Sequence, residues 1–356
     1  MDQTIFNRIK NVLDESGLLS NVKTIPQFDV DFNFSNETIL ITGAAGTIGS
    51  CITRQLLNYQ FKQIILLDNA ETPLYYLQKE LEGPQNTNFH FILSDIRDDD
   101  AMTDLFQTFQ PSIIFHTAAY KHVALMENNP YEAVRLNIFG TKRLADLALL
   151  HQTKKFVFIS TDKAANPIGV MGMTKSIAER YLEGLNTMNE TTFLITRFGN
   201  VLGSNGSLIP LFKKQLKDTH SITVTSNEVS RYFITEDKAC YLILKIVSID
   251  NWDAHVFTFN MGDPIKIIDL ANTLITLYHK KKDVSINFIG LRPGEKMHED
   301  MISNTEELKS TTHQDIYCIV PKLKLKPTLI NLKVIQDITP YQKAVEIKTI
   351  LANFNH

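Results

Sequence analysis

The sequence predicts an α/β protein with a doubly wound parallel sheet and a smaller lobe that is discontinuous in sequence. Two observations support this prediction. Between residues 37 and 197, short apolar runs typical of buried strands alternate with helical segments, the pattern of repeated strand–helix–strand units. The first apolar run also leads directly into a glycine pattern, Gly43-x-x-Gly46-x-x-Gly49. A chain of 356 residues is long enough for both parts.

Composition excludes several classes of protein. A formal net charge of −3 gives no bulk attraction to nucleic acid or to an anionic membrane, so an anionic ligand must be held by a local site. Cys51, Cys240 and Cys318 are too few and too scattered for disulfides or a zinc cluster, and we expect them buried, with no metal site. No apolar run reaches the ~18 residues of a membrane span, and no signal peptide is recognisable. We therefore expect a cytoplasmic protein.

The first strand, residues 37–42, continues into the glycine pattern and then a helix over 51–59. These glycines permit a tight turn and close approach of the backbone to a pyrophosphate, and the helix supplies free N–H groups. A plain strand–turn–helix produces a similar pattern. The second strand, 63–68, ends in Asp68, roughly 20 residues beyond the glycines, where an acid suits the ribose hydroxyls of NAD and repels the extra phosphate of NADP. Asp68 capping the next helix is the alternative.

The third strand, 89–93, precedes Asp95, which accepts either a bond from the adenine amine or the N-terminal N–H groups of the next helix. The fourth strand, 112–117, leads into Ala118 and Ala119, which leave room for a flat ring. Lys121 and His122 follow and face the same cleft, although a lone histidine is more often structural. A long helix is predicted over 130–150, with Asn137 available to hold backbone between strands.

The stretch 156–163 is a predicted strand that delivers Thr161, Asp162 and Lys163 at its carboxyl end, the ligand-binding edge of a parallel sheet. On a helix that begins near Pro167, Met171 and Lys175 share one face. Met171 is unusual, because a thioether cannot transfer a proton. It is either a functional departure or a filler of apolar space.

After a predicted strand at 192–197 the alternation of strands and helices ends, and the sequence indicates a glycine-rich loop at 199–207 and a helix at 208–216. Arg231 and Arg292 lie in predicted loops, where they suit bidentate capture of a diphosphate or are simply solvated. A late strand at 257–262 returns to the sheet. The predicted organisation has four parts. Residues 1–36 are expected to form a helical appendage, and residues 37–198 plus about 236–262 a nucleotide-binding domain. Residues 199–235 plus about 263–330 are expected to form a substrate lobe, and residues 331–356 a C-terminal helix.

Five segments, in order within residues 37–325, resemble the extended short-chain dehydrogenase/reductases of polysaccharide biosynthesis, and within them the UDP-N-acetylglucosamine 4,6-dehydratases. They are Thr42–Gly49, Ala118–Val123, Ser160–Ala164, Arg197–Val201 and Arg292–Lys296. Most of that superfamily has a tyrosine at the position of Met171, in a Tyr-x-x-x-Lys pair. A branch of the dehydratases carries methionine at that position, so Met171 narrows the family assignment to that branch.

The resemblance implies a Rossmann-type domain that binds NAD, a substrate lobe that binds a UDP-N-acetylhexosamine, and assembly into a homo-oligomer. The cofactor residues that it implies, with their neighbours, are Gly43, Ala45, Gly46, Thr47, Ile48, Asp68, Asp95, Ile96, Ala118, Ala119, Tyr120 and Lys175. The substrate residues are Lys121, His122, Asn200, Ser207, Arg231, Arg292 and Glu295. The catalytic group is Thr161, Asp162, Lys163, Met171 and Lys175.

The implied reaction oxidises sugar C4, eliminates water across C5 and C6, and returns the hydride to C6. Lys163 is the candidate base for C5 and Asp162 the candidate acid for the C6 hydroxyl. Because Met171 cannot accept the C4 hydroxyl proton, we hypothesise that Asp162 takes it, directly or through Thr161 or water, and later gives it to the C6 oxygen. A UDP-sugar 4-epimerase and a non-catalytic NAD-binding regulatory protein are the alternative functions.

Overall fold

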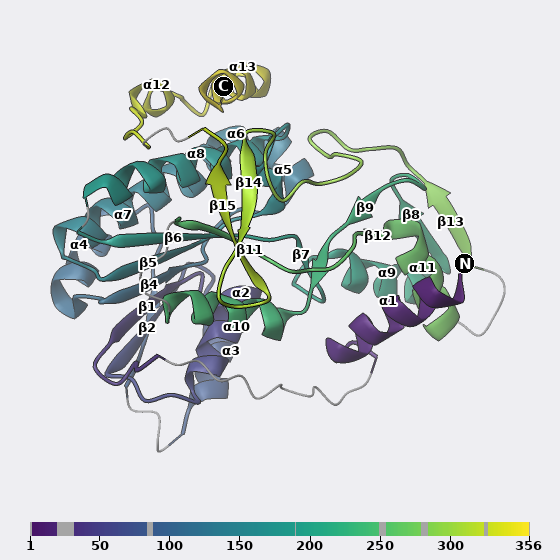
Figure 1. Ribbon diagram of the computed structural model, residues 1–356, viewed down its shortest axis with the longest axis horizontal. Helices are drawn as coiled ribbons and strands as arrows, with labels where there is room; N and C mark the ends of the chain where they lie inside the picture. The colour runs from purple at the N-terminus through teal and green to yellow at the C-terminus, as the bar shows by residue number, and fades with distance from the viewer. Residues whose placement is uncertain are drawn as a thin grey trace.

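The computed structural model describes residues 2–19, 32–83, 88–188, 190–248, 254–278, 284–323 and 327–355. Its centre is one sheet whose strands lie in the order β14-β15-β11-β6-β5-β4-β1-β2-β3 (Figure 1). Their bounds, in that order, are Glu306–Ser310, Ile316–Pro321, Val256–Phe259, Thr192–Arg197, Lys155–Ile159, Ile113–His116, Thr38–Thr42, Gln63–Asp68 and Phe89–Leu93. The seven strands from β11 to β3 are parallel. At the edge, β15 pairs antiparallel with β11, and β14 pairs antiparallel with β15. The predicted fold class is confirmed.

Helices cover both faces of this sheet (Figure 1). One face carries α2, α3 and α10, which are Thr47–Leu56, Glu71–Leu81 and Glu236–Val247. The other carries α4 (Asp99–Phe109), α5 (Val123–Asn128), α6 (Pro130–Ala133), the π-helical turn η1 (Val134–Gly140), α7 (Thr141–Leu150) and α8 (Val170–Leu185). The predicted helix over 130–150 is therefore present, with a π-helical turn that the sequence pattern does not reveal. The predicted helix at 51 begins earlier, at Thr47, inside the glycine pattern.

The smaller lobe has its own apolar core. It contains α9 (Leu208–Thr219), α11 (Ile267–Tyr278) and the short strands β7 (Asn200–Val201), β8 (Ser221–Val224), β9 (Ser230–Arg231), β10 (Phe233–Ile234), β12 (Ile265–Lys266) and β13 (Ser285–Phe288). Helix α1, Gln3–Glu15, packs on α11 and contributes Ile9 and Leu13, each 1% exposed, to that core. It is thus part of the lobe. Residues 20–31 of the predicted appendage lie outside the described residues.

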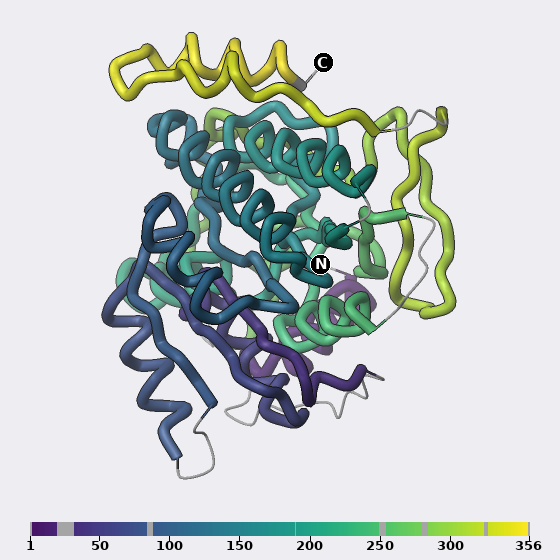
Figure 2. Tube along the Cα trace, turned by 90° about the vertical axis from the view of Figure 1, so that its left-hand side faces the viewer, coloured from purple at the N-terminus to yellow at the C-terminus, as the bar shows by residue number. Residues whose placement is uncertain are grey.

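One predicted boundary differs from the structure. From the sequence, residues from about 263 to 330 are assigned to the lobe, but within that range β15 pairs with β11 and β14 pairs with β15, so both strands extend the main sheet. Neither strand is predicted from the sequence, and pairing between segments this far apart does not follow from local pattern. The C-terminal helices α12 (Lys333–Gln336) and α13 (Ala344–Asn355) lie together across the outer helices, and α13 packs on α6 and α8 (Figures 1 and 2).

Candidate active site

The glycine turn lies beside the point where strand order reverses between β1 and β4, the usual ligand site of a doubly wound sheet. Gly43 has φ +65°, and a Cβ added there would lie 2.7 Å from the Ala118 nitrogen. A Cβ on Gly49 would lie 2.3 Å from the Gly43 oxygen. Gly46 begins α2 and no side chain caps the helix, so the turn has the form of an anion cradle.

The two acids predicted near adenosine lie beside this turn. Asp68 ends β2, and its carboxylate accepts bonds of 2.9 Å from the backbone nitrogens of Ala45 and Ala70. Asp95 makes a bidentate pair with Arg97 at 2.9 and 2.7 Å, and this arginine lowers the pKa of Asp95 to about 2. The alternative in which Asp95 caps the next helix is wrong, because Asp98 is that cap.

The segment after β4 is held by Asn137, as expected. Its Oδ1 accepts a 2.9 Å bond from the Tyr120 nitrogen, and its Nδ2 donates to the Tyr120 oxygen at 3.1 Å. Asn137 lies in η1, and its amide also donates to Thr174 of α8. π-helical turns often occur at functional sites; here the turn ties α8 to the loop that carries Ala118, Ala119 and Lys121.

Asp162 and Lys163 form the polar centre at the carboxyl end of β5, in the 3₁₀ turn η2 (Asp162–Ala164). The Asp162 side chain is 0% exposed. Its Oδ1 accepts bonds of 2.9 Å from Thr161 Oγ1 and Lys163 Nζ. Its Oδ2 has no hydrogen-bond partner among the described residues. Lys163 Nζ also lies 3.4 Å from Asn200 Oδ1, so the predicted catalytic pair meets one predicted substrate residue.

Met171 and Lys175 lie on one buried face of α8, as predicted. Lys175 Nζ lies 3.6 Å from the centroid of the Phe158 ring, and burial lowers the pKa of Lys175 to about 7. In the part of the chain that is described, this amine has no hydrogen-bond or ion-pair partner, which suits a residue that binds ribose hydroxyls. Met171 is 4% exposed and belongs to the apolar core on this face of the sheet.

The burial of Lys175 gives a prediction about stability. Between pH 7 and its ordinary pKa of 10.5, the unfolded chain binds a proton that the folded chain lacks, so the contribution of Lys175 to stability rises with pH. The free energy of unfolding of wild type minus that of Lys175→Met should rise by about 1 kcal/mol per pH unit between pH 7 and 10.

Urea unfolding of the cofactor-free protein measures this difference. Lys217→Met removes an exposed lysine of α9 and serves as the matched control. Its free energy of unfolding should differ from that of wild type by the same amount at every pH. Parallel wild-type and Lys175→Met curves would contradict the lowered pKa of Lys175.

The predicted substrate residues are only partly gathered. Arg231 is buried, and its guanidinium donates to the backbone oxygens of Ser230, Met297 and Lys296 at 2.7, 3.0 and 2.8 Å. Arg292 pairs instead with Glu295 at 2.6 Å on the exposed side of the same loop. Arg231 therefore fixes the loop against β9 in this structure, and its capture of a diphosphate stays a prediction.

The loop 199–207 meets the segment after β4. A Cβ on Gly206 would lie 2.9 Å from the His122 ring, and Gly206 has φ +69°. Burial and the nearby Lys121 lower the pKa of His122. Ser207 begins α9 with a buried hydroxyl that has no partner among the described residues. Like Asp162 Oδ2, this atom is suited to a polar ligand.

Sequence reasoning missed two features. Glu299 is buried, and its Oε1 lies 3.8 Å from Lys163 Nζ and 3.9 Å from Arg231 Nε. The sequence feature that could have pointed to Glu299 is its place just beyond the Arg292–Lys296 segment. Behind Ser160, a buried ion-pair network joins Glu179 to Arg197 at 2.6 Å and Arg197 to Glu306 at 2.8 Å. The network fixes β5 and β6 against α8. No local sequence pattern predicts it, because its residues are far apart in the chain.

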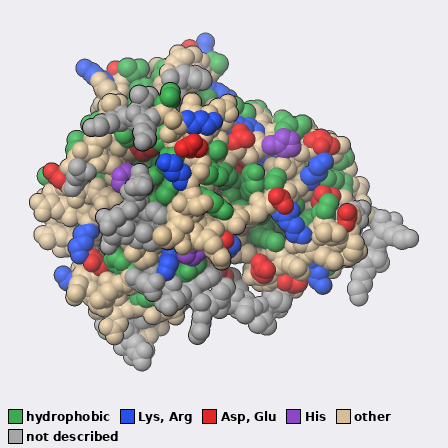
Figure 3. Space-filling view, viewed as in Figure 1, with side chains coloured by type: hydrophobic (Ala, Val, Ile, Leu, Met, Phe, Trp, Pro, Cys, Tyr) green, Lys and Arg blue, Asp and Glu red, His purple; other side chains and the backbone are tan. Residues whose placement is uncertain are grey.

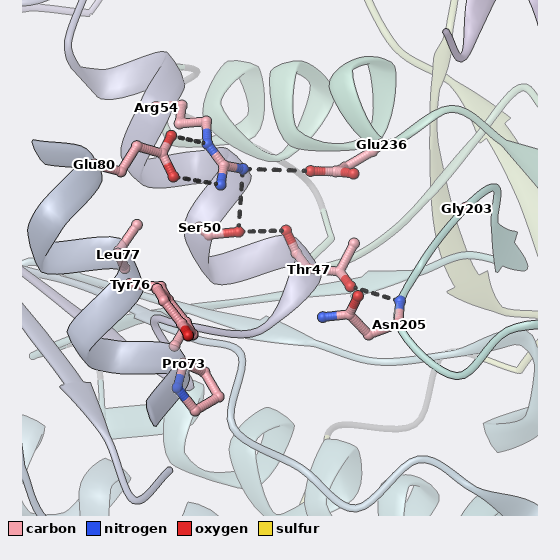
Figure 4. A pocket seen from close by; sticks show the side chains of 11 residues that line it. Thr47, Ser50, Arg54, Pro73, Tyr76, Leu77, Glu80, Gly203, Asn205 and Glu236 are labelled. Carbon is pink, nitrogen blue, oxygen red and sulfur yellow. Dashed lines mark hydrogen bonds and ion pairs between the residues drawn. The ribbon is translucent and has the colours of Figure 1, made fainter. Parts of the chain in front are cut away.

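A separate polar pocket of about 360 Å³ borders the glycine turn (Figure 4). Ala45, Thr47 and Ser50 line it together with Arg54, whose charge is already paired with Glu80 at 2.6 Å. It contains neither Asp162 nor Lys163, so we place the reactive centre elsewhere.

On the face in Figure 3, acidic and basic side chains are interspersed and form no broad basic surface. Within the described residues, no acidic, histidine and cysteine side chains group as metal ligands, and no helix is long and apolar enough to span a membrane. Cys51, Cys240 and Cys318 are all buried, as predicted, and none of them forms a disulfide in the described part of the chain.

The family described as polysaccharide biosynthesis protein matches residues 39–321. The capsular polysaccharide biosynthesis protein CapD of Staphylococcus aureus is 42% identical over 315 residues, which cover 87% of this chain and 52% of that protein. The chain thus spans about half the length of that relative. The solved structure of Pen from Bacillus thuringiensis superposes with a TM-score of 0.75 at 33% identity, over 90% of this chain and 98% of that one.

Two relatives with named activities are equally similar. A UDP-N-acetylglucosamine 4,6-dehydratase (inverting) of Campylobacter jejuni is 30% identical over 297 residues, 82% of this chain and 85% of that protein. A UDP-glucose 4-epimerase of Rickettsia bellii is 30% identical over 307 residues, 80% of this chain and 83% of that protein. Identity alone does not choose between the two reactions.

Proposed function

The chain belongs to the polysaccharide biosynthesis protein family, and from that premise we propose that it is an NAD-dependent 4,6-dehydratase of a UDP-N-acetylhexosamine, most simply UDP-N-acetylglucosamine. The observation that carries the proposal is the Asp162–Lys163 pair at the carboxyl end of β5, in which the Asp162 side chain is 0% exposed and accepts a 2.9 Å bond from Lys163 Nζ. An acid and an amine at one strand end match elimination, which needs one group to give a proton and another to remove one. The product is the 4-keto-6-deoxy sugar nucleotide.

The cofactor residues fit NAD. The glycine turn suits a pyrophosphate, and Asp68 stands at the end of β2. The Lys175 amine, which has no hydrogen-bond partner among the described residues, suits the nicotinamide ribose. NAD held by these residues would supply the hydride acceptor for C4 and the hydride donor for C6. Cytoplasmic location and assembly into a homo-oligomer stay predictions.

The remaining steps belong to the residues of the chain. Ionised Asp162 takes the C4 hydroxyl proton. Its Oδ2, which has no hydrogen-bond partner in the described part of the chain, is available for this, and its contact with Thr161 Oγ1 offers a relay. The C4 ketone then acidifies the C5 proton, which Lys163 removes as a neutral amine. Asp162 gives its proton to the C6 oxygen, which leaves as water. One carboxylate therefore serves two steps.

Product analysis tests the function. Purified protein with NAD and UDP-N-acetylglucosamine should yield a sugar nucleotide lighter by one water in the mass spectrum, with a C6 methyl signal in NMR. A product of unchanged mass and inverted C4 would establish the epimerase, which the Rickettsia relative favours. Binding of NAD and UDP without any turnover would support the regulatory alternative.

Met171→Tyr tests whether position 171 still faces sugar C4. A phenol four residues before Lys175 would add a second acceptor for the C4 proton, so C4 oxidation should become about tenfold faster. Single-turnover absorbance of the reduced cofactor measures the rate, with Met171→Leu as the volume-conserving control. A folded tyrosine variant that is no faster would make Met171 only a core residue, as its 4% exposure also allows.

A further inference from the structure

Glu299 is a buried carboxylate that the proposed mechanism does not use. Its side chain is 3% exposed, and its Oε1 lies 3.8 Å from Lys163 Nζ and 3.9 Å from Arg231 Nε. Its Oε2 has no hydrogen-bond partner among the described residues. Burial raises the pKa of Glu299 and the nearby Asp162 adds to this effect, while Lys163, Arg231 and Lys296 oppose it. A buried carboxylate with one unbonded oxygen is costly when ionised.

The proposed dehydration leaves one proton without a destination. When elimination begins, Asp162 carries the former C4 hydroxyl proton, and Lys163 has to be a neutral amine, so its ammonium group must first lose a proton. Among the described residues, the hydrogen-bond and ion-pair partners of this amine are Asp162, Asn200 and Glu299. Protonated Asp162 and the amide of Asn200 cannot take the proton. Glu299 is the remaining internal acceptor.

Building on the proposed function, we propose that Glu299 is a positioning residue that holds the Lys163 proton while Lys163 acts on C5. The Lys163 Nζ–H bond breaks and a Glu299 Oε1–H bond forms, so an ion pair becomes a neutral pair and the net charge is unchanged. The freed lone pair removes the C5 proton. After Lys163 has returned a proton to C5, Glu299 gives its proton back to the amine, and every group regains its starting state.

The geometry allows this transfer. In the structure Lys163 Nζ donates a 2.9 Å bond to Asp162 Oδ1. Protonation of Asp162 during the reaction weakens this charge-assisted bond. The amine then needs to move by about 1 Å to reach hydrogen-bond distance from Glu299. Burial favours the neutral pair over the charged one. Arg231, anchored on the oxygens of Met297 and Lys296, keeps the loop that carries Glu299 in place.

Glu299→Gln tests the proposal through the pH profile of kcat. In wild type the transfer is internal, so kcat should be flat near neutral pH. In the variant the proton must leave to solvent, so kcat should be about tenfold lower at pH 7 and rise about tenfold per pH unit. KM should stay within about threefold of wild type, because the substrate is not touched.

The matched control is Asp300→Asn, an exposed carboxylate in the same loop, 3.9 Å from Lys296, which should keep the wild-type profile. A flat profile in Glu299→Gln overturns the proposal, whether the variant is fast or slow, because a merely structural role does not create a proton-dependent step. A change in KM alone overturns it as well.

A second measurement does not depend on turnover. Asp162→Asn places a neutral side chain at position 162, as after the first proton transfer. The infrared difference between Asp162→Asn and Asp162→Asn/Glu299→Gln, at pH 7 with NAD, should contain the carbonyl stretch of a protonated carboxylic acid. Carboxylate bands alone overturn the role of Glu299 even if dehydration occurs. Failure of wild type to dehydrate UDP-N-acetylglucosamine instead overturns the proposed function, whatever the infrared result.

Discussion

Asp162→Asn should slow the reduction of NAD in a single turnover by about 10³-fold or more, the upper part of the range for general acid–base catalysis. The substitution keeps the shape of a side chain that is 0% exposed. An amide, however, cannot accept the proton of the C4 hydroxyl. Met171 offers no replacement, because its thioether is not a base at neutral pH. Stopped-flow absorbance with enzyme in excess over UDP-N-acetylglucosamine measures this step.

Lys163→Met is the matched variant, because it alters the neighbouring residue of the same pair. This variant should still reduce the cofactor, because Asp162 remains. The reaction should stop before water is lost, so the 4-keto sugar nucleotide that accumulates should still carry its 6-hydroxyl group in the mass spectrum. Suppose instead that Asp162→Asn reduces NAD at the wild-type rate and stalls only at elimination. Asp162 would then be the acid for C6 alone, and the two-step role would be wrong.

The position of the proposed catalytic pair, Asp162 and Lys163, was predictable because it depends on a local sequence pattern. An apolar run ending in Thr161, Asp162 and Lys163 places these groups at a strand end, and all parallel strand ends meet at one edge. The four-residue spacing of Met171 and Lys175 likewise places them on one helix face. The glycine turn and Asp68 follow from the same logic, and each lies where its pattern indicates.

Features that depend on packing between distant segments were not predictable in this way. Glu299 lies near Lys163 in a loop that Arg231 holds against β9. Nothing in the spacing of residues 292–300 shows this contact. The same holds for α1, whose apolar face predicts a buried side but not the lobe that buries it. Arg231 illustrates the reverse case: an arginine expected to face a ligand is occupied by backbone oxygens.

Gly172→Ala is expected to lower kcat by about 100-fold, the cost of misplacing a catalytic group by about 1 Å. A Cβ on Gly172 would lie 2.2 Å from the backbone oxygen of Lys163 and 3.4 Å from Pro167 Cβ. Alanine favours a helix interior over glycine by about 1 kcal/mol, but this gain does not remove the overlap. Because the displaced oxygen belongs to Lys163, the shift moves the amine relative to Asp162 and Glu299.

Steady-state kinetics and thermal unfolding separate the two effects of Gly172→Ala. The variant should unfold at a temperature only modestly below wild type, since overpacking costs roughly 1–3 kcal/mol, while kcat falls far more than folding accounts for. Ser176→Ala, one turn along α8, is the control and should retain wild-type kcat. If Gly172→Ala keeps wild-type kcat and loses only stability, helix α8 has absorbed the displacement, and Lys163 does not depend on this contact for its position.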